Sequence, residues 1–327
     1  MADVLRKLLD GGKLSDENCR LILRGLGKQV DELHLSKNKA VDELSSDEEE
    51  EVDEEYCRQV KESLGFDIDM NVRIPEWGIA PYELGDCEPP IDISLYGRLG
   101  VHCFNFEKGR NLRVMRIPKY NIELSQTRAY YITMEVEDLA DNFSVHTFQT
   151  LVTRCFPRNN ASLVVFTGIC RLKPETPGEG DADARLDEKA IIEFYKGSMP
   201  DFLSETKLDD KLRFYEVQEQ DICENDWLRL YTEFALFCFW WFNEDGFKFS
   251  LPVEMKKIIV ETRETDGEPC HKLKSGNAIF YINFRAKSRD YRSVVRRTTD
   301  GKTGHIILEI NCWDDQPSPA LTANATR

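Results

Sequence analysis

Regular spacings of apolar residues along the chain predict strands and helices in a definite order. In residues 123–138, Tyr130, Ile132, Met134 and Val136 fall on one face of an extended run, and polar residues fall on the other. Period-2 alternation of this kind is typical of a strand with one buried face. A helix with apolar residues at helical spacing precedes it and is expected to stop at Gly109.

The first structured segment reads as one helix followed by antiparallel strands. The expected strands cover residues 112–124, 129–138 and 145–156, with a fourth over 162–172. Short polar turns connect them, so neighbouring strands should pair in sequence order. A single helix can cover one face of such a sheet and bury its apolar side.

The same order returns later in the chain. An apolar helix over 226–246, closed by Gly246, precedes strands expected over 247–264, 273–287 and 302–313. Residues 129–135 (AYYITME) are similar to residues 278–284 (AIFYINF). These landmarks favour an internal duplication of one helix-plus-sheet unit, and chance similarity between short apolar strands is the competing explanation.

The predicted class is therefore α+β, with two tandem units that each pack one helix on an antiparallel sheet. The expected domains are a helical and acidic arm, partly disordered (1–54), a first unit with a leading helix and loop (55–172), a linker with a short helix over 186–197 (173–221), a second unit (222–315) and a disordered tail (316–327).

The net charge of −16 is concentrated in one place. Residues 42–55 hold ten carboxylates and no basic residue, which leaves about −6 for the remainder. An acidic chain disfavours non-specific nucleic-acid binding, which requires many Lys and Arg residues. Ser45 and Ser46 precede acidic residues and are candidate phosphorylation sites. A solvated, disordered tether is the plainer interpretation of this run.

Several features place the chain inside the cell. Charged residues and glycines interrupt the N-terminal segment before any long apolar run, so no secretion signal is expected. The apolar block 234–242 is far shorter than the ~20 residues that span a bilayer. The ten cysteines form no CxxC motif and are expected to be reduced. The nucleus, or alternatively the cytoplasm, is the expected location.

The sequence offers no constellation for catalysis. It contains no P-loop, GxSxG or GxGxxG motif. His102 and Cys103 are neighbours on a helix and point apart, and Cys270-His271 has no partner at metal-ligand spacing. We therefore predict no catalytic residue, no cofactor and no metal site.

Three places are candidates for contact with other proteins. The hairpin tip Ser125, Gln126 and Thr127 is polar and follows a predicted strand. Trp240 and Trp241 end an aromatic run that either forms a helix buried on all sides or leaves a face for a partner. Arg296 and Arg297 belong to a basic cluster at 285–302 that is a solvated hairpin flank, a docking surface for an acidic segment, or a nuclear import or nucleic-acid signal.

Residues 95–156 resemble a cystatin in the helix SLYGRLGVHCFNFEKG and in the strands after it. The resemblance implies a helix gripped by a curved antiparallel sheet, and many cystatins inhibit papain-like cysteine proteases. At the inhibitory loop this chain has IELSQTR in place of Gln-Val-Val-Ala-Gly, and Cys155-Phe156-Pro157 carries no Trp. The apolar wedge of the inhibitors is therefore largely missing.

A resemblance over roughly residues 55–290 is carried by many ordered blocks. They include EEYCRQVKESLGFDID, RVMRIPKYNIE, FYKGSMPDFLS and KLKSGNAIFYINFRAK. Together these blocks resemble the plant male-sterility-five family, whose biochemical function is unknown. The resemblance implies a role in male fertility and meiosis in the nucleus.

These observations predict a non-enzymatic protein-interaction or adaptor factor. A protein partner is expected, without membrane or nucleic-acid contact. Self-association through a short coiled coil in the N-terminal arm is a further expectation, and a loosely ordered arm is the alternative. A degenerate cystatin-type inhibitor of papain-like proteases is the alternative.

Overall fold

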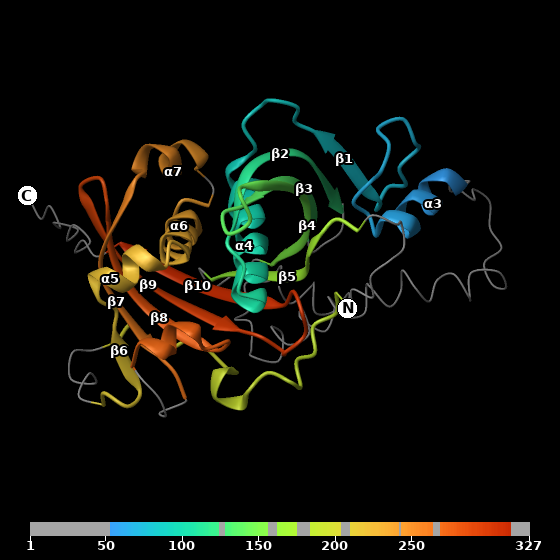
Figure 1. Cartoon of the computed structure of the whole chain (residues 1–327). Helices are drawn as coiled ribbons and strands as arrows, with labels where there is room; N and C mark the ends of the chain where they lie inside the picture. The colour runs from blue at the N-terminus through green and yellow to red at the C-terminus, as the bar shows by residue number, and fades with distance from the viewer. Residues whose placement is uncertain are drawn as a thin grey trace, which may run out of the picture. The chain divides into compact units, whose positions relative to one another are not determined.

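The computed structural model describes residues 53–123, 128–155, 162–174, 184–203, 210–241, 243–263 and 269–314. This part of the chain forms two compact units. The first contains the described residues up to Ser198 together with Arg297–Glu309. The second contains the described residues of Met199–Arg296 and Ile310–Arg327. Both consist of helices and antiparallel strands, which confirms the predicted α+β class (Figure 1).

The first unit has a sheet with strands in the order β1-β2-β3-β4-β5, and the start of β10 lies beside β5. The pairs from β1 to β5 are antiparallel and join neighbours in sequence. Its elements are α3 (Glu54–Ser63), β1 (Ile79–Glu83), α4 (Ile91–Lys108), β2 (Leu112–Glu123), β3 (Arg128–Asp138), β4 (Ser144–Cys155), β5 (Leu163–Leu172) and the 3-10 helix η1 (Glu193–Tyr195).

The long helix α4 packs on one face of this sheet, inside the curve of its strands (Figure 1). It ends at Gly109 in a left-handed conformation with φ of 61°, as the sequence predicts. The four alternating residues of β3 that face it are at most 1% exposed, so the predicted alternation is confirmed. Tyr96 of α4 and Tyr130 of β3 pack with ring centroids 5.0 Å apart. Burying apolar side chains such as Ile132, Met134 and Val136 contributes roughly 1.5–3 kcal/mol each.

The opposite face of the sheet is covered at one end by α3 and the chain that follows it. Phe66 and Ile68 are buried there against Tyr131 and Leu151 of the sheet. The ring of Phe66 meets that of Tyr131 edge to face, with centroids 5.5 Å apart. The expected helix over 55–65 is thus present and has its own small core.

The second unit repeats the plan, with strands in the order β10-β9-β8-β7-β6. Its elements are β6 (Phe214–Glu216), α5 (Glu219–Glu224), α6 (Trp227–Phe239), α7 (Glu244–Ser250), β7 (Val253–Glu261), the 3-10 helix η3 (Pro269–Lys274), β8 (Ala278–Ala286), β9 (Arg289–Thr298) and β10 (Ile306–Asp314), the last two of which contribute residues to both units. Tyr231 of α6 packs on Phe280 of β8 with centroids 5.3 Å apart.

Several predicted boundaries in the later half of the chain are wrong. Helix α6 ends at Phe239, and Gly246 lies inside the separate helix α7 rather than closing α6. Because α7 takes residues up to Ser250, strand β7 begins only at Val253. Asn243 caps α7 by accepting a hydrogen bond from the backbone of Gly246 at 2.7 Å, which starts a new helix where one long helix was expected.

The basic stretch after β8 contains strand β9, which the pattern of charges concealed. The helix expected over 186–197 is also wrong, because this segment holds turns and the single short helix η1. The backbone of this segment is hydrogen-bonded to a distant side chain, because the amide of Asp187 donates to the carboxylate of Asp300 at 2.8 Å. No helix among the described residues is long and apolar enough to span a membrane. The cysteines whose side chains are described are free thiols.

Candidate functional site

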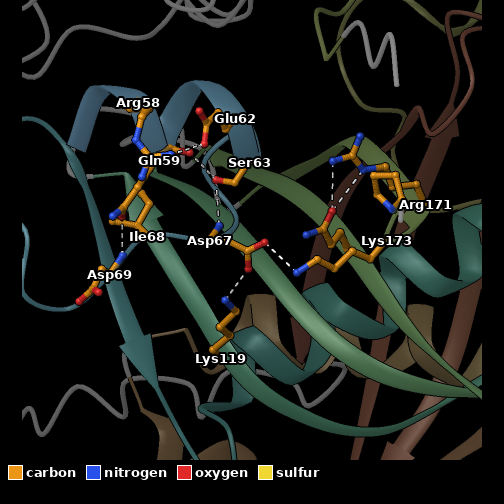
Figure 2. A pocket seen from close by; sticks show the side chains of 12 residues that line it. Arg58, Gln59, Glu62, Ser63, Asp67, Ile68, Asp69, Lys119, Arg171 and Lys173 are labelled. Carbon is orange, nitrogen blue, oxygen red and sulfur yellow. Dashed lines mark hydrogen bonds and ion pairs between the residues drawn. The ribbon is translucent and has the colours of Figure 1, made fainter. Parts of the chain in front are cut away.

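A polar pocket of the first unit lies where α3 and its following turn meet the outer face of the sheet (Figure 2). Its volume is about 460 Å³. The residues lining it are Arg58, Gln59, Glu62, Ser63, Asp67, Ile68, Asp69, Lys119, Gln149, Arg171, Lys173 and Pro174. They come from the α3 segment, β2, β4 and the end of β5, so the fold brings together residues from distant parts of the sequence.

The turn after α3 determines how the pocket is built. Gly65 has φ of +85°, and a Cβ there would lie 2.9 Å from Tyr131 Cε1. Only glycine fits this left-handed conformation so close to the sheet. The turn sends Phe66 and Ile68 into the small core and leaves Asp67 between them, facing the pocket.

Asp67 joins three parts of the first unit. Its carboxylate accepts from Lys119 Nζ of β2 at 2.5 Å and from Lys173 Nζ, just after β5, at 2.8 Å. Its own backbone amide donates to Ser63 Oγ at 3.0 Å. Burial raises the pKa of Asp67, but the hydrogen bonds and charges of the two lysines outweigh it, so the net pKa is lowered. Asp67 is therefore ionised at neutral pH and holds both ammonium groups at the pocket.

Arg171 contributes a half-buried guanidinium. It is paired with Gln149 across β5 and β4, and donates to Gln149 Oε1 from Nε at 3.3 Å and from Nη2 at 3.1 Å. The guanidinium also lies over the ring of Phe66, 5.9 Å from its centroid. Burial lowers the pKa of Arg171. Among the described residues, the hydrogen-bond acceptor for this cation is a neutral amide.

The rim of the pocket consists of Arg58, Glu62 and Asp69, which include charges of both signs. Arg58 on α3 donates to Glu55 and to Glu62, with Nη1 to Glu62 Oε2 at 2.5 Å. These side chains are about half exposed, and surface ion pairs of this kind contribute little to stability. Asp69 accepts from the backbone amide of Asn71 at 2.8 Å.

The described residues lining this pocket are mainly charged and polar hydrogen-bonding groups. Among the described residues, the lining includes no histidine and no cysteine, and Ser63 Oγ donates to the carbonyl of Gln59 at 2.7 Å. A serine engaged in this way, without a neighbouring base, is not an activated nucleophile. The pocket supplies cationic donors, and such donors bind anions.

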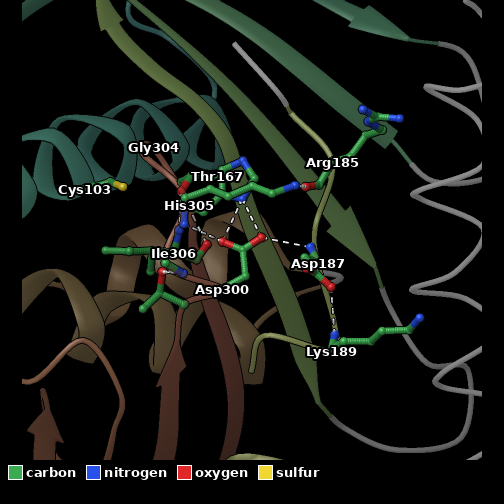
Figure 3. A network of polar contacts seen from close by, with 12 residues as sticks. Cys103, Thr167, Arg185, Asp187, Lys189, Asp300, Gly304, His305 and Ile306 are labelled. Atoms are coloured by element: carbon green, nitrogen blue, oxygen red, sulfur yellow. Dashed lines mark hydrogen bonds and ion pairs between the residues drawn. The ribbon is translucent and has the colours of Figure 1, made fainter. Parts of the chain in front are cut away.

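A second polar network of the first unit surrounds the turn between β9 and β10 (Figure 3). His305 Nδ1 lies 2.9 Å from Asp300 Oδ2, and both side chains have none of their surface exposed. Asp300 also accepts from the backbone amides of Asp187 and Lys302. Burial raises the pKa of Asp300. The hydrogen bonds from His305 and the two amides together outweigh this effect, so the net pKa is lowered.

The same turn is hydrogen-bonded to helix α4 and to strand β5. The amide of Gly304 donates to both carboxylate oxygens of Glu107, at 2.8 and 2.9 Å. The amide of Ile306 donates to Thr167 Oγ1 at 2.8 Å. Because the His305-Asp300 pair is fully buried, it holds the turn in place and is not open to a substrate.

Two buried thiols lie near this turn. Cys170 Sγ donates to the carbonyl of Gly304 at 3.6 Å. Hydrogen bonding with Cys170 and burial raise the pKa of Cys103 well above its usual value. A thiol that stays protonated is a poor nucleophile. Among the described residues, no group of three His, Cys, Asp or Glu side chains is placed to hold a metal ion.

The sequence of this chain is similar to known plant proteins. A UPF0725 protein of Arabidopsis thaliana is 63% identical over 316 residues, which cover 96% of this chain and 98% of the relative. A second UPF0725 protein of the same plant is 40% identical over 86% of this chain and 97% of the relative. The family model described as Protein MS5 matches residues 199–308. The chain belongs to the MS5 family.

A solved structure of the MS5 family supports the fold. The crystal structure of MS5 from Brassica napus matches with a TM-score of 0.55 at 25% identity, and covers 70% of this chain and 100% of that chain. The resemblance to the male-sterility-five family predicted from the sequence is therefore confirmed. The biochemical function of the MS5 family is unknown, so function must be argued from the residues.

Some of the predicted contact residues lie within the described part of the chain, and others lie outside it. Ser125, Gln126 and Thr127, and the candidate phosphorylation sites Ser45 and Ser46, lie outside the described residues. Trp240 and Trp241 are half-buried at the end of α6. Their rings pack edge to face on phenylalanines of that helix, with centroids 5.4 Å apart for Phe239–Trp240 and 5.1 Å for Phe237–Trp241.

The two candidate arginines of the basic cluster, Arg296 and Arg297, are buried. Arg296 is 7% exposed and Arg297 has none of its surface exposed. The guanidinium of Arg297 lies over the ring of Phe106, 4.6 Å from its centroid. Burial and the charge of Arg297 lower the pKa of His102 to about 3. A partner approaching this part of the MS5 protein would therefore meet other side chains first.

The residues of the pocket were missed by sequence analysis, because no motif links them. Asp67, Lys119, Arg171 and Lys173 are spread over more than 100 positions. One signal was present: Arg171 and Lys173 alternate at the end of a strand that is otherwise almost entirely apolar. Such alternation predicts that both project from the same face, but not what lies opposite them.

Proposed function

We propose that this MS5 protein is a non-enzymatic protein-interaction factor that contacts its partner through the segment 70–82. The observation that carries the proposal is Trp77, whose side chain is 68% exposed. Met70 and Tyr82, in the same segment, are 54% and 39% exposed. Large exposed apolar side chains close together in one segment are typical of interaction sites, and Trp and Tyr are enriched among residues that dominate binding energy.

The segment is anchored, so its aromatic side chains are presented in a defined geometry. The amide of Ile79 donates to Tyr56 Oη at 2.6 Å, in the small core beneath α3. The amide of Gly78 closes a turn onto the carbonyl of Pro75 at 2.9 Å. Tyr82 stacks on Tyr120 of β2 with centroids 5.1 Å apart. A pre-ordered surface loses little entropy on binding.

The proposal extends to the biology that the MS5 likeness implies. We place the protein in male fertility and meiosis, acting in the nucleus, with self-association through its N-terminal arm. Nuclear action would be checked by the location of a fluorescent fusion in developing flower buds. Self-association would be checked by sedimentation of the full chain beside a form lacking residues 1–52.

A degenerate cystatin-type inhibitor is the second candidate. It is supported by the arrangement of each unit, in which one helix packs on an antiparallel sheet, and we propose that both units are cystatin-like. An inhibitor of this kind would block a papain-like protease at near-equimolar ratio. A protease that keeps its full activity in a large excess of the chain would exclude this candidate.

The interaction proposal is tested by capture from developing flower buds with three matched forms of the full chain. Trp77→Ala removes the exposed indole, while Phe249→Ala removes a side chain of the second unit that is 71% exposed. We expect a specific set of proteins to be retained by the unaltered chain and by Phe249→Ala, and lost from Trp77→Ala. Equal recovery by all three forms would contradict the proposal.

A further inference from the structure

We propose that the pocket lined by Lys119, Arg171 and Lys173 is a binding site for a phosphoryl group. These three cations project from β2, from β5 and from the residues directly after β5. Figure 2 shows Lys119 and Lys173 converging on Asp67, with Arg171 beside them. The pocket adjoins the segment 70–82, because Asp69 at its rim accepts from the amide of Asn71. The three cations lie outside that segment, and the proposal does not depend on the interaction role.

The charge at the centre of the pocket suits a dianion. Lys119, Arg171 and Lys173 surround Asp67, which leaves an excess of two positive charges at the centre. Over all the described lining residues, Arg58, Glu62 and Asp69 at the rim reduce this excess to one. A phosphate monoester carries about −1.5 to −2 at neutral pH and offers three strong acceptor oxygens. A carboxylate would neutralise only one of the two charges.

Arg171 supplies the strongest single argument. Among the described residues its guanidinium donates to a neutral amide, although it is half-buried. Burying a charge without an opposite charge in contact is costly. The planar guanidinium has five donors in a fork that matches phosphate oxygens. A bound phosphoryl group would supply the anionic acceptor that Gln149 does not.

The two lysines are held ready to share a ligand. Each ammonium group has three donors, and the contacts at 2.5 Å and 2.8 Å to Asp67 each engage one of them. Asp67 therefore fixes both nitrogen atoms at the pocket and leaves further donors for an incoming oxygen. Its position between the two lysines makes it a positioning residue for the proposed site.

The size of the pocket indicates what it can admit. A volume of about 460 Å³ exceeds the space that a bare phosphate needs, so a phosphoryl group could enter attached to a larger molecule. At the rim, Glu62 accepts from Arg58 and Asp69 accepts from Asn71, so both acids already have donors. The shared chemistry is a phosphoryl dianion, either on a small molecule or on a phosphorylated side chain of a protein.

Titration calorimetry of the full chain, at constant ionic strength and pH 7.5, tests the site. The probes are inorganic phosphate, O-phosphoserine and a short phosphoserine peptide, with acetate and the unphosphorylated peptide as controls. We expect saturable binding of the phosphorylated probes, at least about tenfold tighter than acetate binding. Tighter binding of the peptide than of O-phosphoserine would identify a protein side chain as the source, and equal binding would identify a small molecule.

Three substitutions make the test specific to the pocket. Arg171→Gln and Lys173→Gln should each weaken phosphate binding by about tenfold or more, because each removes a charge-assisted hydrogen bond. Arg113→Gln, an exposed arginine of β2 that pairs with Glu137 away from the pocket, should leave the affinity unchanged. If Arg171→Gln fails to fold, Lys173→Gln decides alone, since its side chain is 42% exposed. Equal binding by Lys173→Gln and the unaltered chain, or no saturable binding, would overturn the proposal.

Discussion

At the level of single residues, the carboxylate of Asp67, in the turn after α3, connects β2 with the residue directly after β5. It accepts hydrogen bonds from lysines more than 50 positions away in each case. A carboxylate bound by two ammonium groups stabilises the folded state only while it is ionised. The contribution of Asp67 to stability should therefore depend on pH.

Replacing Asp67 with Asn should show this dependence. The folded-state pKa of Asp67 is lowered, so its stabilising effect is fully present above the unfolded value of about 3.9 and is lost as the pH falls through the folded value. Urea unfolding at pH 7 should therefore show Asp67→Asn to be less stable than the unaltered chain. The difference should shrink at pH 2.5.

The matched control for this prediction is Asp86→Asn. Asp86 is fully exposed and its nearest cation, Arg116, is 3.8 Å away. Its replacement should change stability by no more than about 0.5 kcal/mol at either pH, as is usual for surface substitutions. A difference between Asp67→Asn and the unaltered chain that stays constant with pH would show that Asp67 acts through packing and not through its charge.

At the level of elements, the close approach of α4 to β4 determines how the first unit packs. A Cβ placed on Gly100 would lie 2.2 Å from Thr150 Oγ1 and 2.5 Å from Thr150 Cβ. Contacts this short require backbone movement, because the Cβ atom of Thr150 cannot rotate away. Helix α4 can lie against the sheet here because position 100 has no side chain.

Gly100→Ala should therefore destabilise the first unit by about 1–3 kcal/mol, the usual cost of overpacking a core. Gly97→Ala, on the same helix, is the control. Its nearest neighbours are the flexible ends of Ile117 and Met134 at 3.1 Å, so it should cost less. Urea unfolding of both forms measures the difference. A Gly97→Ala form as unstable as Gly100→Ala would contradict this account of the helix packing.

Much of the secondary structure was predictable where one physical signal dominated. Strand β3 alternates cleanly because one of its faces meets α4, and α4 stops where Gly109 adopts a left-handed conformation. Strand β9 was missed because its arginines resemble a solvated flank, although Arg297 is buried over Phe106. Charge pattern alone does not reveal that an aromatic ring will cover a guanidinium.

The pocket could not be predicted for a different reason. Its residues meet through strand register and through the turn at Gly65, and both are tertiary features. The register pairs Gln149 with Arg171 across β4 and β5. A shift of one residue would turn Arg171 to the opposite face. Sequence alternation indicates which residues share a face, whereas the register decides which neighbours they meet.

At the level of the whole molecule, each unit packs a tyrosine of its helix on an aromatic residue of a strand, and the two contacts can be matched residue by residue. The sequence comparison aligned Tyr130 with Ile279, one residue away from the structural match. In the structure Tyr130 packs on Tyr96 of α4, and Phe280 packs on Tyr231 of α6. The equivalent residues are thus Tyr130 and Phe280, and this correspondence favours the internal duplication over chance similarity.

The next position on each strand supports the same correspondence. Tyr131 Oη donates to Glu123 Oε2 at 3.3 Å, and Tyr281 Oη donates to Glu261 Oε2 at 2.6 Å. Glu123 ends β2 and Glu261 ends β7, the strand that precedes the tyrosine in each unit. In the second unit Glu261 also accepts from Arg213 Nε at 2.6 Å. The tyrosine–glutamate pair of the second unit therefore has the shorter hydrogen bond and one more donor than the corresponding pair of the first unit.

Removing the two hydroxyl groups should reveal this asymmetry. Tyr281→Phe should destabilise the second unit by about 1.5–3 kcal/mol, the range for a hydrogen bond to a charged group. Tyr131→Phe, whose bond is longer, should cost less than about 1 kcal/mol. The two costs would be compared by urea unfolding. A larger cost for Tyr131→Phe would contradict the order that the distances predict.

The central claim is that the segment 70–82 presents Trp77 to a protein partner, and site-directed photo-crosslinking tests it most directly. A photoreactive phenylalanine analogue would replace Trp77 in the full chain, and Phe249 in a matched control, in developing flower buds. The account predicts a discrete crosslinked protein from position 77 that is absent from position 249. No adduct at position 77, or the same adducts from both positions, would contradict it.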